Sequence, residues 1–276
     1  MKVAYQGEAG AFSESAARRL LGPEAIGVPC GSFEQMFAAV GAGEADCCVA
    51  PIENSLAGSI HRNYDLLLNS DLTIAGETSM RIVHNLIAAP DVVLDDVRRV
   101  YSHPVALAQC TRFFTKYPNI EAMPVHDTAG GVRMVMDRGR KDEAGIASAV
   151  AAEIYGGRVL LEAIEDNAQN FTRFFLLVPP EREVVPKETS RRWKTSVVFR
   201  VANKPGALFR ALGAFAIFEI DLSKIESRPI EGRPWEYAFY LDFIGKLDET
   251  NVARALDSLR ELAEMVRVLG SYPTRW

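Results

Sequence analysis

The sequence lacks the features of a membrane protein or a nucleic-acid-binding protein. Its 276 residues contain no run approaching the ~18 to 20 apolar residues that a membrane-spanning helix requires. The net charge of −5 argues against nucleic acid or an anionic membrane surface as a partner. The first ten residues, MKVAYQGEAG, turn polar after a short apolar stretch, unlike a secretory signal. We therefore expect a cytoplasmic protein, in which an anionic ligand would need a local positive site.

Cysteine and histidine are scarce, with four of each. The cysteines are Cys30, Cys47, Cys48 and Cys110. They form no C-x-x-C pair, and the histidines have no spacing typical of metal ligands. We expect neither a disulfide framework nor a metal site, and we interpret the cysteines as small core residues.

One segment, PPEREVVPKETSRRW at 179–193, is typical of a linker. It holds three prolines and seven charged residues, and it has neither a helical nor a strand period. We therefore predict an N-terminal domain at 1–180, a linker at 181–193 and a C-terminal domain at 194–276.

The N-terminal part alternates short buried strands with amphipathic helices, which predicts parallel sheet with helices on both faces. Two extended runs, at 72–89 and 171–178, break this rhythm. We interpret them as two crossings between lobes, so the expected architecture is α/β, with two lobes and a cleft as in periplasmic binding proteins.

Small polar residues recur where predicted strands lead into helices. A helix N-cap is the simple interpretation of each one alone. Together they predict a ligand cleft, because the carboxyl ends of parallel strands and the helix N-termini gather there. The residues are Ser13, Asn54, Ser55, Ser102, Thr128 and Ser148.

The stretch NAQNFTRFFLL places Thr172 and Arg173 side by side in an apolar strand. A buried arginine needs a partner, which is either an anionic ligand or a structural ion pair. Thr172 is either a donor to a ligand or a β-branched strand residue.

The C-terminal part predicts the element order β-α-β-β-α-β, the ferredoxin-like plan. Its turn ANKPGA precedes a helix with an apolar face, and ESRP lies near the end of the second strand. By pattern alone this is a small α+β module.

The chain resembles prephenate dehydratases across nearly its full length, including a C-terminal ACT regulatory domain. One departure is Val105 after His103 and Pro104, where the family pattern has a polar residue. The matching stretches are YQGEAGAFS, PIENSLAGSI, SHPVALAQC, DTAGG, NFTRFFLL, NKPGALFRAL, ESRP and GSYP.

The resemblance implies the loss of carbon dioxide and water from prephenate, giving phenylpyruvate for phenylalanine synthesis. Aromatisation drives this reaction, so it implies no cofactor and no metal. It assigns Thr172 as the catalytic donor to the leaving hydroxyl, with Glu53 or His103 as alternative ultimate proton sources. It assigns the substrate contacts to Glu53, Asn54, Ser55, Ser102, His103, Thr128, Arg173 and Phe174.

The resemblance also implies feedback inhibition by L-phenylalanine bound to the ACT domain, in a homodimer or tetramer. The implied allosteric residues are Asn203, Gly206, Ala207, Leu208, Glu226, Ser227, Arg228 and Pro229. Two alternative functions remain open from the sequence. One is arogenate dehydratase, and the other is a two-lobed small-molecule sensor without catalysis.

Overall fold

The computed structural model describes residues 1–182, 184, 186, 192–230 and 232–274. Much of the predicted linker 181–193 lies outside the described residues, which leave out 183, 185 and 187–191. The chain divides into two compact units. The first is Met1–Leu66 with Ser79–Phe174, and the second is Leu67–Thr78 with Phe175–Trp276.

One sheet has the strand order β2-β1-β3-β11-β5, with β4 paired to β3; β1 to β4 lie in the first unit, and β5 and β11 run from it into the second. The neighbours β1–β2 and β1–β3 are parallel, as the alternating pattern predicts. The strands are β1 (Lys2–Gln6), β2 (Ile26–Cys30), β3 (Cys47–Asn54), β4 (Gly58–Ser59), β5 (Thr73–Arg81) and β11 (Phe171–Val178). The helices that accompany them are α1 (Phe12–Leu21), α2 (Phe33–Gly41) and α3 (His61–Leu68).

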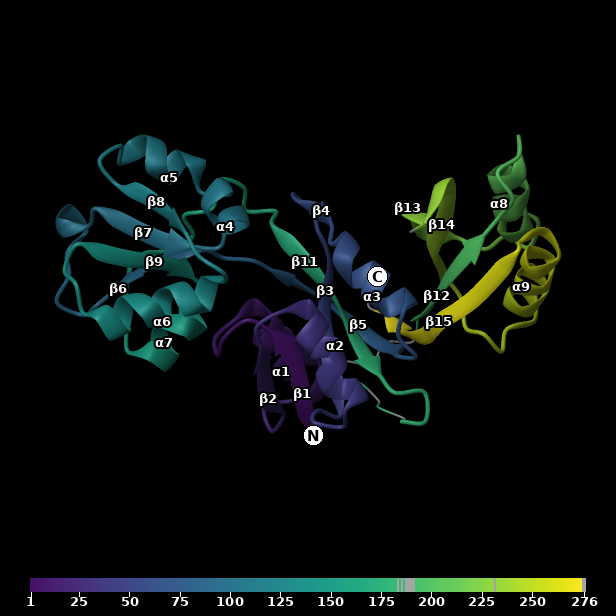
Figure 1. Cartoon of the computed structure of the whole chain (residues 1–276), viewed down its shortest axis with the longest axis horizontal. Helices are drawn as coiled ribbons and strands as arrows, with labels where there is room; N and C mark the ends of the chain where they lie inside the picture. Colours follow the sequence, from purple (N-terminus) through teal and green to yellow (C-terminus); the bar gives the residue numbers. More distant parts are fainter. Residues whose placement is uncertain (183, 185, 187–191, 231, 275–276) are drawn as a thin grey trace. The chain divides into compact units, whose positions relative to one another are not determined.

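A second sheet, in the first unit, has the order β10-β6-β9-β7-β8. Helices α4 and α5 lie on one face of it, and α6 and α7 on the other (Figure 1). Its strands are β6 (Asn85–Ala88), β7 (Arg99–Ser102), β8 (Glu121–Pro124), β9 (Glu143–Ala147) and β10 (Arg158–Leu161). Its helices are η1 (Leu94–Asp96), α4 (Pro104–Ala108), α5 (Thr111–Lys116), α6 (Thr128–Arg138) and α7 (Ala149–Tyr155).

The expectation of parallel pairing holds for β7 with β8 and for β7 with β9. Strand β6 lies in the run at 72–89 that breaks the alternation, and it pairs antiparallel with both β9 and β10. Strand β6 enters this sheet directly from the extended run and not through a helical crossover, which is the connection that joins parallel neighbours. The interruption at 72–89 marks this point in the sequence.

Serine side chains cap α2 and α7. Of the residues expected as N-caps only Ser148 is one, because the N-cap of α1 is Ala11 and that of α4 is His103. Ser32 Oγ accepts a hydrogen bond from the Gln35 amide at 3.2 Å, and Ser148 Oγ accepts one from Ala151 at 3.1 Å. At α6 the N-cap is Asp127 rather than Thr128, which is the first helical residue. A carboxylate suits the positive end of the helix dipole, so the helix begins one residue earlier than expected.

The second unit confirms the predicted order β-α-β-β-α-β. Its four strands form an antiparallel sheet with the order β13-β14-β12-β15. Both helices contribute to one core with that sheet. The elements are β12 (Arg192–Arg200), α8 (Ala207–Ile217), β13 (Leu222–Ile230), β14 (Arg233–Ile244), α9 (Thr250–Leu262) and β15 (Met265–Thr274).

The segment 67–78 belongs to the second unit through polar contacts to β12 and β15. Glu77 forms a buried ion pair with Lys194 at 2.7 Å and accepts a hydrogen bond from Thr274 Oγ1. Arg267 donates to the carbonyl oxygens of Leu68 at 2.9 Å and Ser70 at 2.6 Å. Strands β5 and β11 therefore each have one end in the first unit and the other in the second. No described helix is both long and apolar enough to cross a membrane.

Candidate active site

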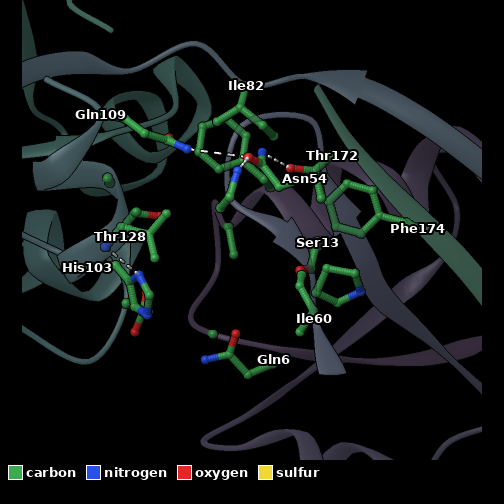
Figure 2. A pocket seen from close by; sticks show the side chains of 18 of the residues that line it. Gln6, Ser13, Asn54, Ile60, Ile82, His103, Gln109, Thr128, Thr172 and Phe174 are labelled. Atoms are coloured by element: carbon green, nitrogen blue, oxygen red, sulfur yellow. Dashed lines mark hydrogen bonds between the residues drawn. The ribbon is translucent and has the colours of Figure 1, made fainter. Parts of the chain in front are cut away.

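The first unit contains a cavity of about 330 Å³ lined by residues that follow strands of both its sheets. Five of the nine residues expected to hold substrate or act on it line this cavity. His103 and Thr128 lie on one side of it, and Thr172 and Phe174 on the other (Figure 2). The five are Asn54, His103, Thr128, Thr172 and Phe174.

Strand geometry separates Thr172 from Arg173. Thr172 and Phe174 line the cavity, and Arg173 between them does not. Successive side chains of a strand point to opposite faces, which accounts for the difference. The Arg173 side chain is buried, with Nη1 4.0 Å from Oε2 of Glu53. Glu53 does not line the cavity either.

The two expected serines also lie outside the cavity lining. Ser55 Oγ donates to the carbonyl of Gln169 at 2.8 Å and accepts from the amide of Phe171 at 2.9 Å. Ser102 is fully buried, and its Oγ donates to the carbonyl of Ile146 at 2.7 Å. In the structure these hydroxyls hold neighbouring backbone segments in place.

Asn54 determines how the Thr172 hydroxyl is oriented. Asn54 Oδ1 accepts from the amides of Leu56 and Ala57, at 3.0 and 2.8 Å. Its Nδ2 must then be the donor to Thr172 Oγ1, at 2.9 Å (Figure 2). Because Thr172 accepts this bond, its own proton is left free to be donated to a ligand.

Two further amides extend this arrangement, and the sequence reasoning missed both. Asn54 Nδ2 also donates to Asn170 Oδ1 at 2.8 Å, and Asn170 Nδ2 donates to Gln109 Oε1 at 2.9 Å. Gln109 lines the cavity, whereas Asn170 is fully buried behind it. Both residues stand inside stretches that were singled out, NAQNFTRFFLL and SHPVALAQC, so the motifs themselves held the signal.

His103 presents a hydrogen-bond donor to the cavity. Its Nδ1 accepts from the amide of Val105 at 3.3 Å, so the neutral ring carries its proton on Nε2. Burial lowers the pKa of His103, the nearby His126 lowers it further, and Asp127 acts in the opposite direction. The ring is thus neutral near pH 7.

Among the described residues, the cavity lining includes no lysine or arginine. Two helices instead begin at the lining, and the N-terminus of a helix carries partial positive charge. Ser13 lies in the first turn of α1, and Thr128 begins α6. The lining also includes Gln6, His84 and Asp127, which sequence reasoning did not assign to the site.

The residues expected to form an allosteric site lie on two elements of the second unit. Gly206 is the N-cap of α8, with Ala207 and Leu208 in the first turn. Asn203 precedes that turn and donates through Nδ2 to the Trp235 carbonyl at 3.2 Å. The other four are in the edge strand β13 and are Glu226, Ser227, Arg228 and Pro229.

A family model for prephenate dehydratase matches residues 3–182. The chain belongs to the prephenate dehydratase family. A second model, for the ACT domain, matches residues 195–261. The resemblance inferred from the motifs is therefore confirmed, and the activity is that of a lyase in aromatic amino acid biosynthesis.

Plant relatives align with almost the whole chain. Arogenate dehydratase/prephenate dehydratase 2, chloroplastic, of Arabidopsis thaliana is 44% identical over 282 residues, covering 99% of this chain and 73% of the relative. Arogenate dehydratase 2 of Petunia hybrida is 44% identical over 288 residues, covering 99% and 72%.

Solved structures share the fold over the same length. Prephenate dehydratase from Arthrobacter aurescens, in complex with L-phenylalanine, has a TM-score of 0.89 and 34% identity, covering 99% of this chain and 90% of that one. GqqA, described as a novel type of quorum quenching acylase, also has a TM-score of 0.89, with 36% identity, covering 99% and 98%.

Proposed function

We propose that the chain converts prephenate into phenylpyruvate, carbon dioxide and water. The observation that carries this proposal is the Thr172 hydroxyl, which accepts a hydrogen bond from Asn54 and keeps its proton free in the cavity. Hydroxide is a poor leaving group, so the reaction needs a donor at the departing oxygen. Because aromatisation drives the reaction and no net oxidation occurs, the chemistry requires neither a redox cofactor nor a metal.

In this proposal each lining residue has a role that suits a dianionic substrate. Thr172 donates to the leaving hydroxyl, and His103 and Thr128 donate to carboxylates together with the helix N-termini. Phe174 packs against the ring of the substrate. Since Glu53, Ser55, Ser102 and Arg173 do not line the cavity, we assign them to holding β3, β7 and β11 in position. Their direct contact with substrate stays a prediction from the sequence.

The preference between prephenate and arogenate is a separate question, because the Arabidopsis relative is named for both activities and the Petunia relative for arogenate alone. Steady-state kinetics with each substrate decides it. Formation of phenylpyruvate from prephenate above the uncatalysed rate supports dehydratase activity on prephenate. Turnover of arogenate alone would assign the substrate to the alternative enzyme. Binding of both without turnover would leave the non-catalytic sensor.

For the whole chain we propose a catalytic domain at 1–180, a linker at 181–193 and a phenylalanine-binding domain at 194–276. The Arthrobacter aurescens structure with bound L-phenylalanine supports this assignment. We propose the allosteric site at the start of α8 and in β13, and a homodimer or tetramer in the cytoplasm. In the described sheet β13 is an edge strand, and an edge strand can pair with the edge strand of a second copy. Calorimetry with L-phenylalanine and sedimentation analysis test both points.

A further inference from the structure

We propose that His84 is a further substrate-binding residue, whose Nδ1 accepts a hydrogen bond from the substrate's leaving hydroxyl. His84 lines the cavity with Thr172 and is 2% exposed. Its Nδ1 is buried and has no hydrogen-bond partner within the described part of the chain. The inference rests on the proposed dehydratase reaction. In it the departing hydroxyl contacts His84 as well as Thr172.

The tautomer of His84 follows from a series of fixed orientations that begins at the backbone. Backbone amides fix Asn54 Oδ1 as an acceptor, so Asn54 Nδ2 is a donor and Asn170 Oδ1 accepts from it. Asn170 Nδ2 is then the donor to Oε1 of Gln109, at 2.9 Å. Each amide therefore has one consistent orientation.

Gln109 Oε1 also lies 3.0 Å from His84 Nε2. Because this amide oxygen can only accept, Nε2 must carry the proton of the neutral ring. Burial lowers the pKa of His84, which keeps the ring neutral near pH 7. His84 Nδ1 therefore has a free lone pair and no hydrogen.

Two hydrogen bonds fix the backbone of His84, and its ring packs against Phe12. The His84 amide donates to Glu165 Oε2 at 3.0 Å, and its carbonyl accepts from Ile164 at 2.9 Å. The edge of one ring meets the face of the other between His84 and Phe12, with centroids 5.8 Å apart. A buried acceptor without a partner is unfavourable, and a ligand that donates to it removes this penalty.

The chemistry of prephenate identifies the group that fits. Its two carboxylates and its side-chain ketone accept hydrogen bonds only, and the ring hydroxyl carries its one O–H. An acceptor-only nitrogen can therefore pair with that hydroxyl and with no other group of the substrate. When the hydroxyl donates to His84, its oxygen lone pairs are available to the Thr172 proton. His84 accepts a hydrogen bond throughout and takes up no proton.

Two substitutions separate the two nitrogens of the ring. In His84→Gln the amide reaches the Nε2 position and keeps a donor for Gln109, while the acceptor at the Nδ1 position is lost. In His84→Asn the amide occupies the Nδ1 position instead. We expect His84→Gln to lower kcat/KM for prephenate at least tenfold, and His84→Asn to retain more activity. Thermal unfolding and circular dichroism check that both variants fold.

Phenylpyruvate provides the matched ligand, because it lacks the hydroxyl. Its inhibition constant should change less than twofold in His84→Gln. Equal weakening of phenylpyruvate and prephenate would show that His84 only shapes the cavity, and would overturn the inference. A kcat/KM for prephenate in His84→Gln within twofold of wild type would also overturn it. Absence of turnover in the wild-type protein would instead refute the proposed function.

A measurement that leaves His84 intact covers the case in which the substitutions prevent folding. Thr172→Ala, labelled with ¹⁵N-histidine, should show the His84 Nδ1 resonance of an unprotonated nitrogen. Prephenate should shift this resonance in the direction of an accepted hydrogen bond, and phenylpyruvate should not. The same shift with both ligands, or with neither, would contradict the proposed contact.

Discussion

The Thr172 hydroxyl is part of the cavity lining. Its oxygen accepts a hydrogen bond from Asn54, and its proton can be donated to a ligand. We expect Thr172→Ala to lower kcat by roughly 10² to 10³, the cost of losing one transition-state donor. Thr172→Ser is the matched control, since it keeps the hydroxyl and loses a methyl group, and it should retain most activity. Stopped-flow or steady-state detection of phenylpyruvate measures both. Turnover of the alanine variant within a few-fold of wild type removes Thr172 from the mechanism.

Two roles are open for Arg173. The sequence predicts that it binds the substrate, whereas in the structure its guanidinium lies near Glu53. Arg173→Lys keeps the charge but loses the planar group that can hold a carboxylate through two bonds. Because the side chain does not line the cavity, we expect lower thermal stability with a KM within a few-fold of wild type. A KM raised tenfold or more at unchanged stability would restore the direct substrate contact predicted from the sequence.

Site residues that stand in local motifs could be predicted from the sequence. Residues whose role depends on a contact far away in the sequence could not. Thr172 and His103 stand in recognisable motifs at strand and helix ends, so pattern and resemblance identify them. His84 stands in an apolar run, and its importance depends on a ring orientation set by Gln109, 25 positions away. A tautomer fixed by a distant amide has no signature in local spacing. For Arg173, strict strand alternation already indicated a face opposite to Thr172.

Two of the strands that bear or lead to cavity residues, β5 and β11, extend into the second unit. Strand β11 bears Thr172 near its start, and Phe175, where its second-unit part begins, contacts Tyr272 with ring centroids 6.0 Å apart. Strand β5 leads to Ile82 in the cavity lining and bears Glu77 in the second unit. The sequence predicts that both runs are extended. It does not predict which residues they contact. Glu77 and Thr274 are 197 positions apart, too far for any local pattern to pair them.

The ion pair of Glu77 with Lys194 should contribute strongly to holding β5 in the second unit. Both side chains are about 2 to 3% exposed, and removing one charge from such a pair costs about 3 to 5 kcal/mol. We therefore expect Glu77→Gln to lower the melting temperature by several degrees. Asp257→Asn, which breaks an exposed pair with Arg260 in α9, is the control and should change it little. Equal melting temperatures for the two variants would contradict this view of β5.

At the scale of the whole molecule, the proposed regulation requires that phenylalanine binding to the C-terminal domain alters the cavity of the first unit. Linkage makes this reciprocal, so prephenate or an unreactive analogue should weaken phenylalanine binding by the same factor. Ligand at ~100 times its dissociation constant should also stabilise the fold by about 2.7 kcal/mol. Calorimetric titration with and without phenylpyruvate in the cavity measures whether the two sites are coupled.

Gly206 offers a substitution that separates regulation from catalysis. Its φ of +75° is a conformation that glycine adopts readily and valine does not, and an added Cβ would lie 3.2 Å from Arg210 Nη1. Gly206→Val should therefore distort the start of α8 and relieve inhibition by phenylalanine, while kcat and KM for prephenate stay within about threefold.

Gly213→Ala in the same helix is the matched control, because an added Cβ there meets nothing within 4 Å. Helix propensity favours alanine at that position, so inhibition should persist. Inhibition curves for the three proteins, at one prephenate concentration, give the comparison. If Gly206→Val remains as sensitive to phenylalanine as Gly213→Ala, the turn before α8 is not the regulatory site, and the C-terminal domain would serve assembly alone.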